Sequence, residues 1–307
     1  MENVYHQGEI QIQEKVGESL MAQSNGRVIS RNIIKGAVNF IEKQPMAIVS
    51  SVDHYNQVWV SLLIGDYGFV SVRDEQELLF DKTKIHSDPK DIFFNNITSS
   101  GPVASLFIEL ETRRRFRING TVTNNGHLIK MLVLEAYPNC PKFIQQREIS
   151  VPEHFKKTSP LKMTGKTLPE SLMRWIMTSD TLFVGSQSAH SRLDASHRGG
   201  PSGFVEILDD QTLKIPDYPG NSMYNTFGNI HQNPNVGLLF IDFEKKKTLQ
   251  LTGEAELTFN RTTPLDMLKT SGTGRYWTFK TKQWILAENH HEVVWKFLSH
   301  SPYNPPI

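Results

Sequence analysis

The stretch Val-Ala-Ser-Leu-Phe-Ile-Glu-Leu-Glu at residues 103–111 recurs 133 residues later as Val-Gly-Leu-Leu-Phe-Ile-Asp-Phe-Glu at residues 236–244. Each stretch leads to a glycine, Gly120 in the first case and Gly253 in the second. Similarity at a fixed spacing is the signature of a repeated structural unit, and such apolar runs favour buried β-strands. The sequence therefore predicts two copies of one β-rich unit.

Segments upstream of these stretches also repeat, at a spacing of 135 residues. Gly68-Phe69-Val70 matches Gly203-Phe204-Val205, and Ser51 matches Ser186. A two-residue deletion in the second copy reconciles the two spacings. The repeat therefore covers most of the chain.

Each copy is predicted to begin with a helix. Apolar residues at helical spacing run from Ile33 to Ile41 and stop before Pro45, and the corresponding positions in the second copy fall at 168–176. Thr167 and Glu170 there form a Thr-x-x-Glu pattern, which predicts a capping box at the start of the second helix.

Short β-like runs at 46–52 and 181–186 follow these helices. Basic runs at 112–115 and 245–247 are interpreted as solvated hairpin turns, not as a nucleic-acid site. Many short strands after one helix favour a small barrel, and two barrels in one chain can pack as a pseudo-dimer. The predicted fold is mainly β with a few helices. It has an N-terminal extension (1–30), a first barrel (31–150) and a second barrel (160–307).

The composition limits the possible partners. The 33 Lys and Arg residues nearly balance the 32 Asp and Glu residues, so no global field draws the protein to nucleic acid or to an anionic membrane. Cys140 is the single cysteine and cannot form an internal disulfide, and no apolar run approaches the ~20 residues of a membrane span. We therefore expect a cytoplasmic protein that binds neither nucleic acid nor membrane.

The two copies differ in one interval of equal length. The first copy holds an apolar run at 58–64, whereas the second holds a polar segment at 188–201 with two histidines, two arginines and paired glycines. Such residues suit an anion pocket, although an ordinary surface loop is the alternative. A second polar segment follows at 215–229. The sequence thus predicts a ligand loop in the second copy and one principal site per chain.

The second copy contains the motifs Ser196-His197-Arg198-Gly199-Gly200, Gly203-Phe204-Val205, Gly220-Asn221 and Asn225-Thr226-Phe227-Gly228-Asn229 before Asn233-Pro234. In this combination they resemble the pyridoxamine 5'-phosphate oxidase-like, FMN-binding split barrels. The resemblance extends from Tyr5-His6-Gln7-Gly8-Glu9 to the final strand and suits tandem, two-barrel members of the group. It implies that FMN lies at the interface of the two barrels.

The resemblance also implies a contribution from the end of the first copy, where Asn139-Cys140-Pro141-Lys142 resembles a segment of such flavoproteins. An ordinary turn with a small buried cysteine is the alternative, and Cys140 is not assigned a catalytic role. The Ser-Arg-Lys-Gly pattern of the oxidase itself is missing near Asn225, so we expect Arg198, Arg192 or Lys142 to bind the phosphate. The predicted FMN-binding residues are Ser186, Ser188, Arg192, His197, Arg198, Gly199, Gly200, Asn221, Asn225, Thr226, Asn229, Asn139 and Lys142.

The predicted function is an FMN-dependent oxidoreductase that uses a small-molecule redox substrate or a nicotinamide donor. The alternative is a flavin, haem or deazaflavin-binding protein without turnover, acting as a carrier, sensor or scavenger. No metal is expected, because adjacent histidines such as His290 and His291 point to opposite faces of a strand. Both halves of the interface lie in one chain, so a monomer or a homodimer is expected.

Overall fold

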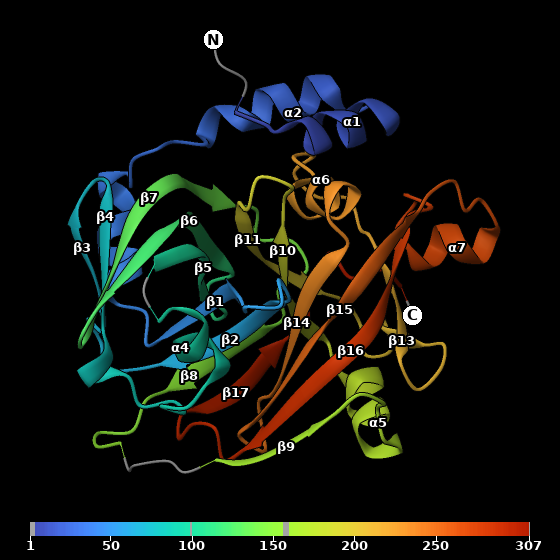
Figure 1. The fold of residues 1–307 in the computed structure, drawn as a ribbon. Helices are drawn as coiled ribbons and strands as arrows, with labels where there is room; N and C mark the ends of the chain where they lie inside the picture. Colours follow the sequence, from blue (N-terminus) through green and yellow to red (C-terminus); the bar gives the residue numbers. More distant parts are fainter. Residues whose placement is uncertain (1–3, 99, 156–159, 307) are drawn as a thin grey trace.

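The computed structural model describes residues 4–98, 100–155 and 160–306 and is dominated by two large antiparallel sheets (Figure 1). The first sheet has seven strands in the order β2-β1-β5-β6-β7-β4-β3. The second has the corresponding order β11-β10-β14-β15-β16-β13-β12, with β9 added on β16. The prediction of a mainly β fold built from two such units is confirmed. The domain boundaries given above stay a prediction.

The strands of the first unit follow the helix α3 (Lys35–Glu42), whose buried positions Ala37, Phe40 and Ile41 have helical spacing. The strand β2 is buried along its whole length, because one face packs on its own barrel and the other on the second unit. The strands are β1 (Met46–Val52), β2 (Val58–Ile64), β3 (Val70–Asp74), β4 (Glu77–Asp81), β5 (Ser100–Glu109), β6 (Arg114–Asn125) and β7 (Leu128–Asn139).

The second unit repeats this arrangement after the helix α5 (Glu170–Thr178). The predicted capping box is wrong: Pro169 is the N-cap residue and makes no side-chain cap, and the Thr167 carbonyl accepts a hydrogen bond from Trp284. The strands are β9 (Leu161–Gly165), β10 (Thr181–Gln187), β11 (Leu193–Gly199), β12 (Glu206–Ile207), β13 (Thr212–Pro216), β14 (Asn235–Asp242), β15 (Lys247–Thr258) and β16 (Tyr276–Glu288).

Irregularities of the two sheets also correspond. Arg113 and Lys246, which lie 133 residues apart in matching hairpin turns, both have a φ of 57°. The pairing register shifts at Gly120 between β6 and β7 and at Gly253 between β15 and β16. The two glycines that follow the opening stretches therefore mark one structural feature, a β-bulge in each sheet.

The bulge at Gly120 leads to a stability prediction. A Cβ on Gly120 would lie 2.1 Å from the Leu132 carbonyl oxygen, so the neighbouring backbone must move. We expect Gly120→Ala to lower the free energy of unfolding by about 1–3 kcal/mol, measured by denaturant titration. Gly101→Ala on the adjacent strand β5 is the control, because its Cβ would have no neighbour within 4 Å. Equal stability of the two variants would refute the role of the bulge.

Three apolar cores organise the molecule. One fills each barrel, and the third lies between the barrels, where β1, β2 and β5 of the first unit meet β10, β11 and β14 of the second. A two-stranded antiparallel sheet of β8 (Gln146–Ser150) and β17 (Val294–Ser299) adds Trp295 to this shared core. The seam is thus a closely packed interface that is largely apolar.

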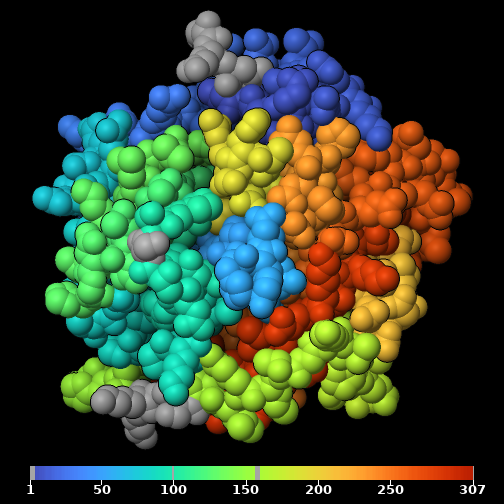
Figure 2. All heavy atoms as spheres, in the orientation of Figure 1, coloured from blue at the N-terminus to red at the C-terminus, as the bar shows by residue number. Residues whose placement is uncertain are grey.

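The N-terminal helices cross one end of this seam (Figures 1 and 2). Tyr5 and Ala22 from this segment pack in one apolar cluster with Tyr137 of the first unit and Met223 of the second. Within the described residues, no helix is long and apolar enough to cross a membrane. The remaining helices are α1 (Gln7–Lys15), α2 (Ser19–Asn25), η1 (Gly26–Val28), η2 (Lys82–Lys84), α4 (Ile92–Asn96), α6 (Asn225–Gln232) and α7 (Pro264–Lys269).

Two local predictions are wrong. Within the polar segment at 188–201, residues 193–199 form the strand β11, which pairs with β10 along its whole length, and the Ser196 side chain there bonds to Asp194 and Thr226. His290 and His291 lie between β16 and β17, outside any strand, so they do not alternate across a sheet. Both of these histidines are buried.

Candidate functional site

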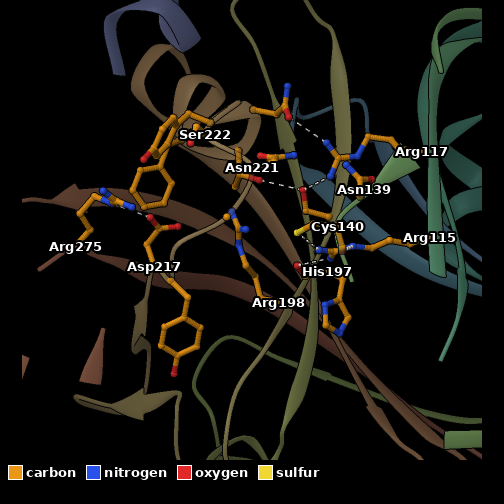
Figure 3. Close-up of a pocket in the computed structure, with 17 residues that line it drawn as sticks. Arg115, Arg117, Asn139, Cys140, His197, Arg198, Asp217, Asn221, Ser222 and Arg275 are labelled. Carbon is orange, nitrogen blue, oxygen red and sulfur yellow. Dashed lines mark hydrogen bonds and ion pairs between the residues drawn. The ribbon is translucent and has the colours of Figure 1, made fainter. Parts of the chain in front are cut away.

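A cavity of about 80 Å³ lies at the edge of the seam, between the ends of β6 and β7 of the first unit and β11 of the second (Figure 3). Both units and the segment after β13 line it. The residues that line it are Arg115, Arg117, Asn139, Cys140, Ser196, His197, Arg198, Asp217, Tyr218, Gly220, Asn221, Ser222, Tyr224, Asn225, Thr226, Phe227 and Arg275.

The strand β6 brings two arginines to the cavity by simple alternation. Arg115 and Arg117 are two residues apart, so both side chains lie on one face of the strand. Arg117 is only 6% exposed and forms an ion pair with Asp194 at 2.8 Å. It also donates to the Ser196 hydroxyl at 2.8 Å and to the Ala195 carbonyl at 2.9 Å. Arg117 therefore joins the two units through a buried, charge-compensated network.

Arg115 and Arg198 differ from Arg117, because neither forms an ion pair with a carboxylate within the described residues. Arg115 donates to the carbonyl oxygens of Cys140 and His197, and its Nη2 lies 3.5 Å from the Cys140 sulfur. The Nε of Arg198 is buried and has no hydrogen-bond partner among the residues that the structure describes. Burial, together with repulsion from Arg117 and Arg198, lowers the pKa of Arg115. Two uncompensated cations thus face one small cavity.

The helix α6 begins at the same cavity. Its N-cap residue Tyr224 has a left-handed backbone, and no side chain caps the helix. Tyr224, Asn225, Thr226 and Phe227 from this first turn all line the cavity. The free N–H groups and the positive end of the helix dipole favour an anion at such a position. The helix and the two arginines therefore indicate the same kind of ligand.

His197 is a neutral wall of the cavity. It is 3% exposed, and in the described part of the chain neither ring nitrogen has a hydrogen-bond partner. Burial, followed by the charges of Arg115, Arg198 and Arg147, holds its pKa well below the usual value. The ring therefore stays uncharged and leaves the positive charge of the cavity to the arginines.

This neutral histidine leads to a prediction about acid stability. A lowered folded-state pKa means that, below about pH 6.5, the unfolded chain takes up a proton that folded His197 does not. Its contribution to stability is present above that pH and is lost as the pH falls. We expect His197→Leu to reduce the pH dependence of the unfolding free energy by up to about 1.4 kcal/mol per pH unit below pH 6.5. Denaturant titrations between pH 5 and 8 measure this, and parallel curves for the two proteins would contradict it.

On the opposite wall of the cavity, the positive charge of Arg275 is compensated by a carboxylate. Arg275 donates to Asp217 at 2.9 Å, and both side chains are less than a tenth exposed. Tyr218 stacks on Phe143 with ring centroids 4.7 Å apart. Figure 3 shows Arg275 and Asp217 across the cavity from Arg115. The positive field is consequently strongest on the side of Arg115 and Arg198.

The structure brings together six of the thirteen predicted site residues, namely Asn139, His197, Arg198, Asn221, Asn225 and Thr226. Asn229 and Ser186 lie in the layer behind and bond to each other at 3.0 Å. The others do not line the cavity. Arg192 is exposed beside Glu135, Lys142 lies near the Tyr303 ring, Ser188 holds a turn, and Gly199 and Gly200 pack against Phe143 and Phe204.

Sequence reasoning missed the two β6 arginines: the basic run at 112–115 that contains Arg115 was interpreted as a solvated turn, and Arg117, just beyond it, was not considered. The turn ends at Arg113, and Arg115 already lies inside the strand. A signal was available: Arg115 and Arg117 correspond to Thr248 and Gln250 in the second copy. Charged residues that replace neutral ones at inward-facing strand positions indicate a specialised site.

The matching position in the other half of the pseudo-dimer is neutral. Gln250 donates to the Ser61 hydroxyl at 2.8 Å and to the Val60 carbonyl at 2.9 Å, which reproduces the bonds of Arg117 to Ser196 and Ala195. Leu62 and Leu63 occupy the places of His197 and Arg198. One half of the seam therefore carries the cationic cavity, and the other carries its uncharged counterpart.

Comparison with known proteins gives structural similarity only. No family model and no curated protein sequence matches the chain. The HupZ protein of Group A Streptococcus is 12% identical over 44% of this chain and 98% of its own, with a TM-score of 0.32. A Clostridium acetobutylicum protein related to general stress protein 26, of the pyridoxinephosphate oxidase family, is 14% identical over 39% and 87%, with a TM-score of 0.28. HutZ, the heme storage protein of Vibrio cholerae, is 16% identical over 41% and 92%, with a TM-score of 0.25. Each is similar to about two fifths of this chain along most of its own length.

Proposed function

We propose that the chain is a two-barrel FMN-binding oxidoreductase of the pyridoxamine 5'-phosphate oxidase-like class, with one flavin held at the seam. The observation that carries this proposal is the pair of uncompensated arginines, Arg115 and Arg198, at a cavity onto which the α6 N-terminus opens. A phosphate monoester supplies the charge that these groups lack. The fold and the motifs from Ser196 to Asn229 support a flavin as the rest of the ligand.

The size of the cavity suits the phosphate end of such a ligand. About 80 Å³ accommodates a group of a few heavy atoms, whereas pockets that enclose a whole cofactor measure about 300–1,000 Å³. The cavity would therefore enclose the phosphate and not the flavin ring. When bound, FMN would supply the redox chemistry. Arg115, Arg198 and Asn225 would bind and orient it.

A single site per chain follows from the asymmetry of the seam. At the pseudo-equivalent position, uncharged residues stand in place of Arg115, Arg117, His197 and Arg198, namely Thr248, Gln250, Leu62 and Leu63. Both halves of the retained site come from one chain, so we propose that a monomer is sufficient to bind the flavin.

The first experiment identifies the ligand. Protein purified under mild conditions is denatured, and the released compound is analysed by absorbance and mass spectrometry. FMN is the expected product. Release of haem or a deazaflavin would show that the cofactor is not FMN, and the cavity would remain the proposed site. A protein that carries no ligand and that does not bind added FMN would overturn the proposal.

A second experiment separates an oxidoreductase from a flavin carrier. Anaerobic mixing with NADH or NADPH should bleach the flavin absorbance near 450 nm if a nicotinamide is the electron donor. A bound flavin that neither nicotinamide nor a chemical mediator reduces would favour a carrier, sensor or scavenger.

A further inference from the structure

The N-terminal helix α1 meets α6 backbone to backbone. A Cβ on Gly8 would lie 2.3 Å from the Gly228 carbonyl oxygen, and a Cβ on Gly228 would lie 2.7 Å from the Glu9 Cα. No side chain separates the two helices at this crossing, because neither position has room for one. Such a contact sets the position of one helix on the other within narrow limits.

Two hydrogen-bond chains extend this contact to the cavity. His6 Nδ1 accepts from the Gly8 N–H, so Nε2 carries the proton and donates to Asn229 Oδ1 at 2.9 Å. Glu9 accepts from the His6 N–H at 2.8 Å and from the Asn225 side chain at 2.5 Å. Asn225 Oδ1 in turn accepts from Arg117 at 3.3 Å. Glu9 thereby reaches a residue that lines the cavity.

Further hydrogen bonds join the segment before α6 to the N-terminal helices α1 and α2. Gln13 donates to the Met223 carbonyl at 3.0 Å, and Asn25 donates to the Asn221 carbonyl at 2.7 Å. Gln13 and Glu9 are both nearly completely buried. The N-terminal segment therefore holds the chain from Asn221 to Asn229 at four side-chain contacts, along the stretch that contributes the first turn of α6 to the cavity.

We propose that the N-terminal helix is part of the cofactor site, with Glu9 and His6 as positioning residues that hold Asn225 and the α6 N-terminus against the ligand. This inference rests on the proposed binding of FMN. It changes the interpretation of residues 1–30 from an extension outside the barrels to a component of the site.

Glu9 also makes the site sensitive to pH. Burial, followed by the nearby carboxylates of Glu135 and Asp194, raises the pKa of Glu9 to about 8. Glu9 is therefore neutral at pH 7, and its ionisation above pH 8 adds a negative charge behind an anion cavity. The charged and titratable groups that interact with Glu9 or with its partners His6 and Asn225 are Tyr5 and His6 before α1, Arg117 on β6, Glu135 on β7, Asp194 on β11, and His190 and Arg192 in the turn before β11.

The test compares FMN affinity at pH 7 and pH 9 for the full chain, Glu9→Ala, Glu9→Gln and Glu14→Gln. Glu14 is an exposed control on the same helix. We expect Glu9→Ala to weaken binding at pH 7 by about tenfold, since Asn225 loses its hydrogen-bond partner. Glu9→Gln should bind within about threefold of the unmodified chain at pH 7. At pH 9 the unmodified chain and Glu14→Gln should bind FMN roughly 3- to 20-fold more weakly than at pH 7. Glu9→Gln should not show this loss.

The outcomes separate this inference from the proposed function. A folded Glu9→Ala protein with unchanged affinity at both pH values would refute the positioning role while the FMN site stands. An identical pH profile for Glu9→Gln and the unmodified chain would also refute it. If the unmodified chain does not bind FMN, both the proposed function and this inference are overturned. Circular dichroism of each variant verifies folding.

Discussion

Replacement of Arg115 and Arg198 together by alanine is expected to raise the dissociation constant for FMN by about 10²- to 10⁴-fold. Each charge-assisted hydrogen bond to a phosphate contributes about 1.5–3 kcal/mol, which corresponds to roughly 10- to 150-fold in affinity. Neither arginine forms an ion pair within the described residues, so a bound phosphate would be their main source of charge compensation. Quenching of flavin fluorescence on titration measures the change.

Arg192→Ala is the matched control for this experiment. Arg192 precedes β11, whereas Arg198 lies within it, and Arg192 is exposed beside Glu135 at 3.4 Å, outside the cavity. It should alter FMN affinity by less than about threefold, because exposed ion pairs contribute little. Arg198→Ala alone should leave the unfolding free energy nearly unchanged, since no carboxylate loses its partner. Equal effects of Arg192→Ala and Arg198→Ala on affinity would place the anion site elsewhere.

The largest expected loss of stability belongs to Arg117→Gln. Arg117 and Asp194 are both almost completely buried, and their ion pair at 2.8 Å lies at the junction of the two units. Removal of one partner leaves a buried charge uncompensated, which typically lowers the free energy of unfolding by about 3–5 kcal/mol. Denaturant titration of the apo-protein measures this effect without any ligand.

A second substitution tests the physical cause. Asp194→Asn added to Arg117→Gln should recover most of the lost stability, because the unpaired charge disappears. The chain already contains a neutral version of this arrangement, in which Gln250 bonds to Ser61 and Trp59 stands in the place of Asp194. A single variant that loses less than about 1 kcal/mol, or a double variant no more stable than the single, would show that the pair is not a buried ion pair.

Much of the fold could be predicted from the sequence, because a repeat constrains both copies together. The stretches at 103–111 and 236–244 are the strands β5 and β14 with their turns, and Gly120 and Gly253 mark the bulge in each sheet. Hydrophobic patterning and glycine position are local properties, and they were sufficient here. The intervals after Ser51 and Ser186 were harder to predict, because one is apolar and the other polar although both form strands, β2 and β11.

The site could be predicted only in part, because it depends on contacts between distant segments. Polarity favoured a loop for Leu193–Gly199, yet Arg117 from the other unit satisfies the polar groups of that strand. The role of Arg115 was hidden by its place in a basic run. Glu9 is 216 residues away from its partner Asn225 in the sequence. Apart from the motif Tyr5-His6-Gln7-Gly8-Glu9, nothing in the sequence around Glu9 indicates this contact.

The stoichiometry of FMN binding tests the central claim most directly. Titration of apo-protein at concentrations well above the dissociation constant should reach saturation at one FMN per chain, and the Arg115→Ala/Arg198→Ala variant should not saturate under the same conditions. Two FMN per chain would contradict the asymmetry of the seam. Saturation at one FMN per chain with unchanged affinity in the double variant would contradict the assignment of the cavity.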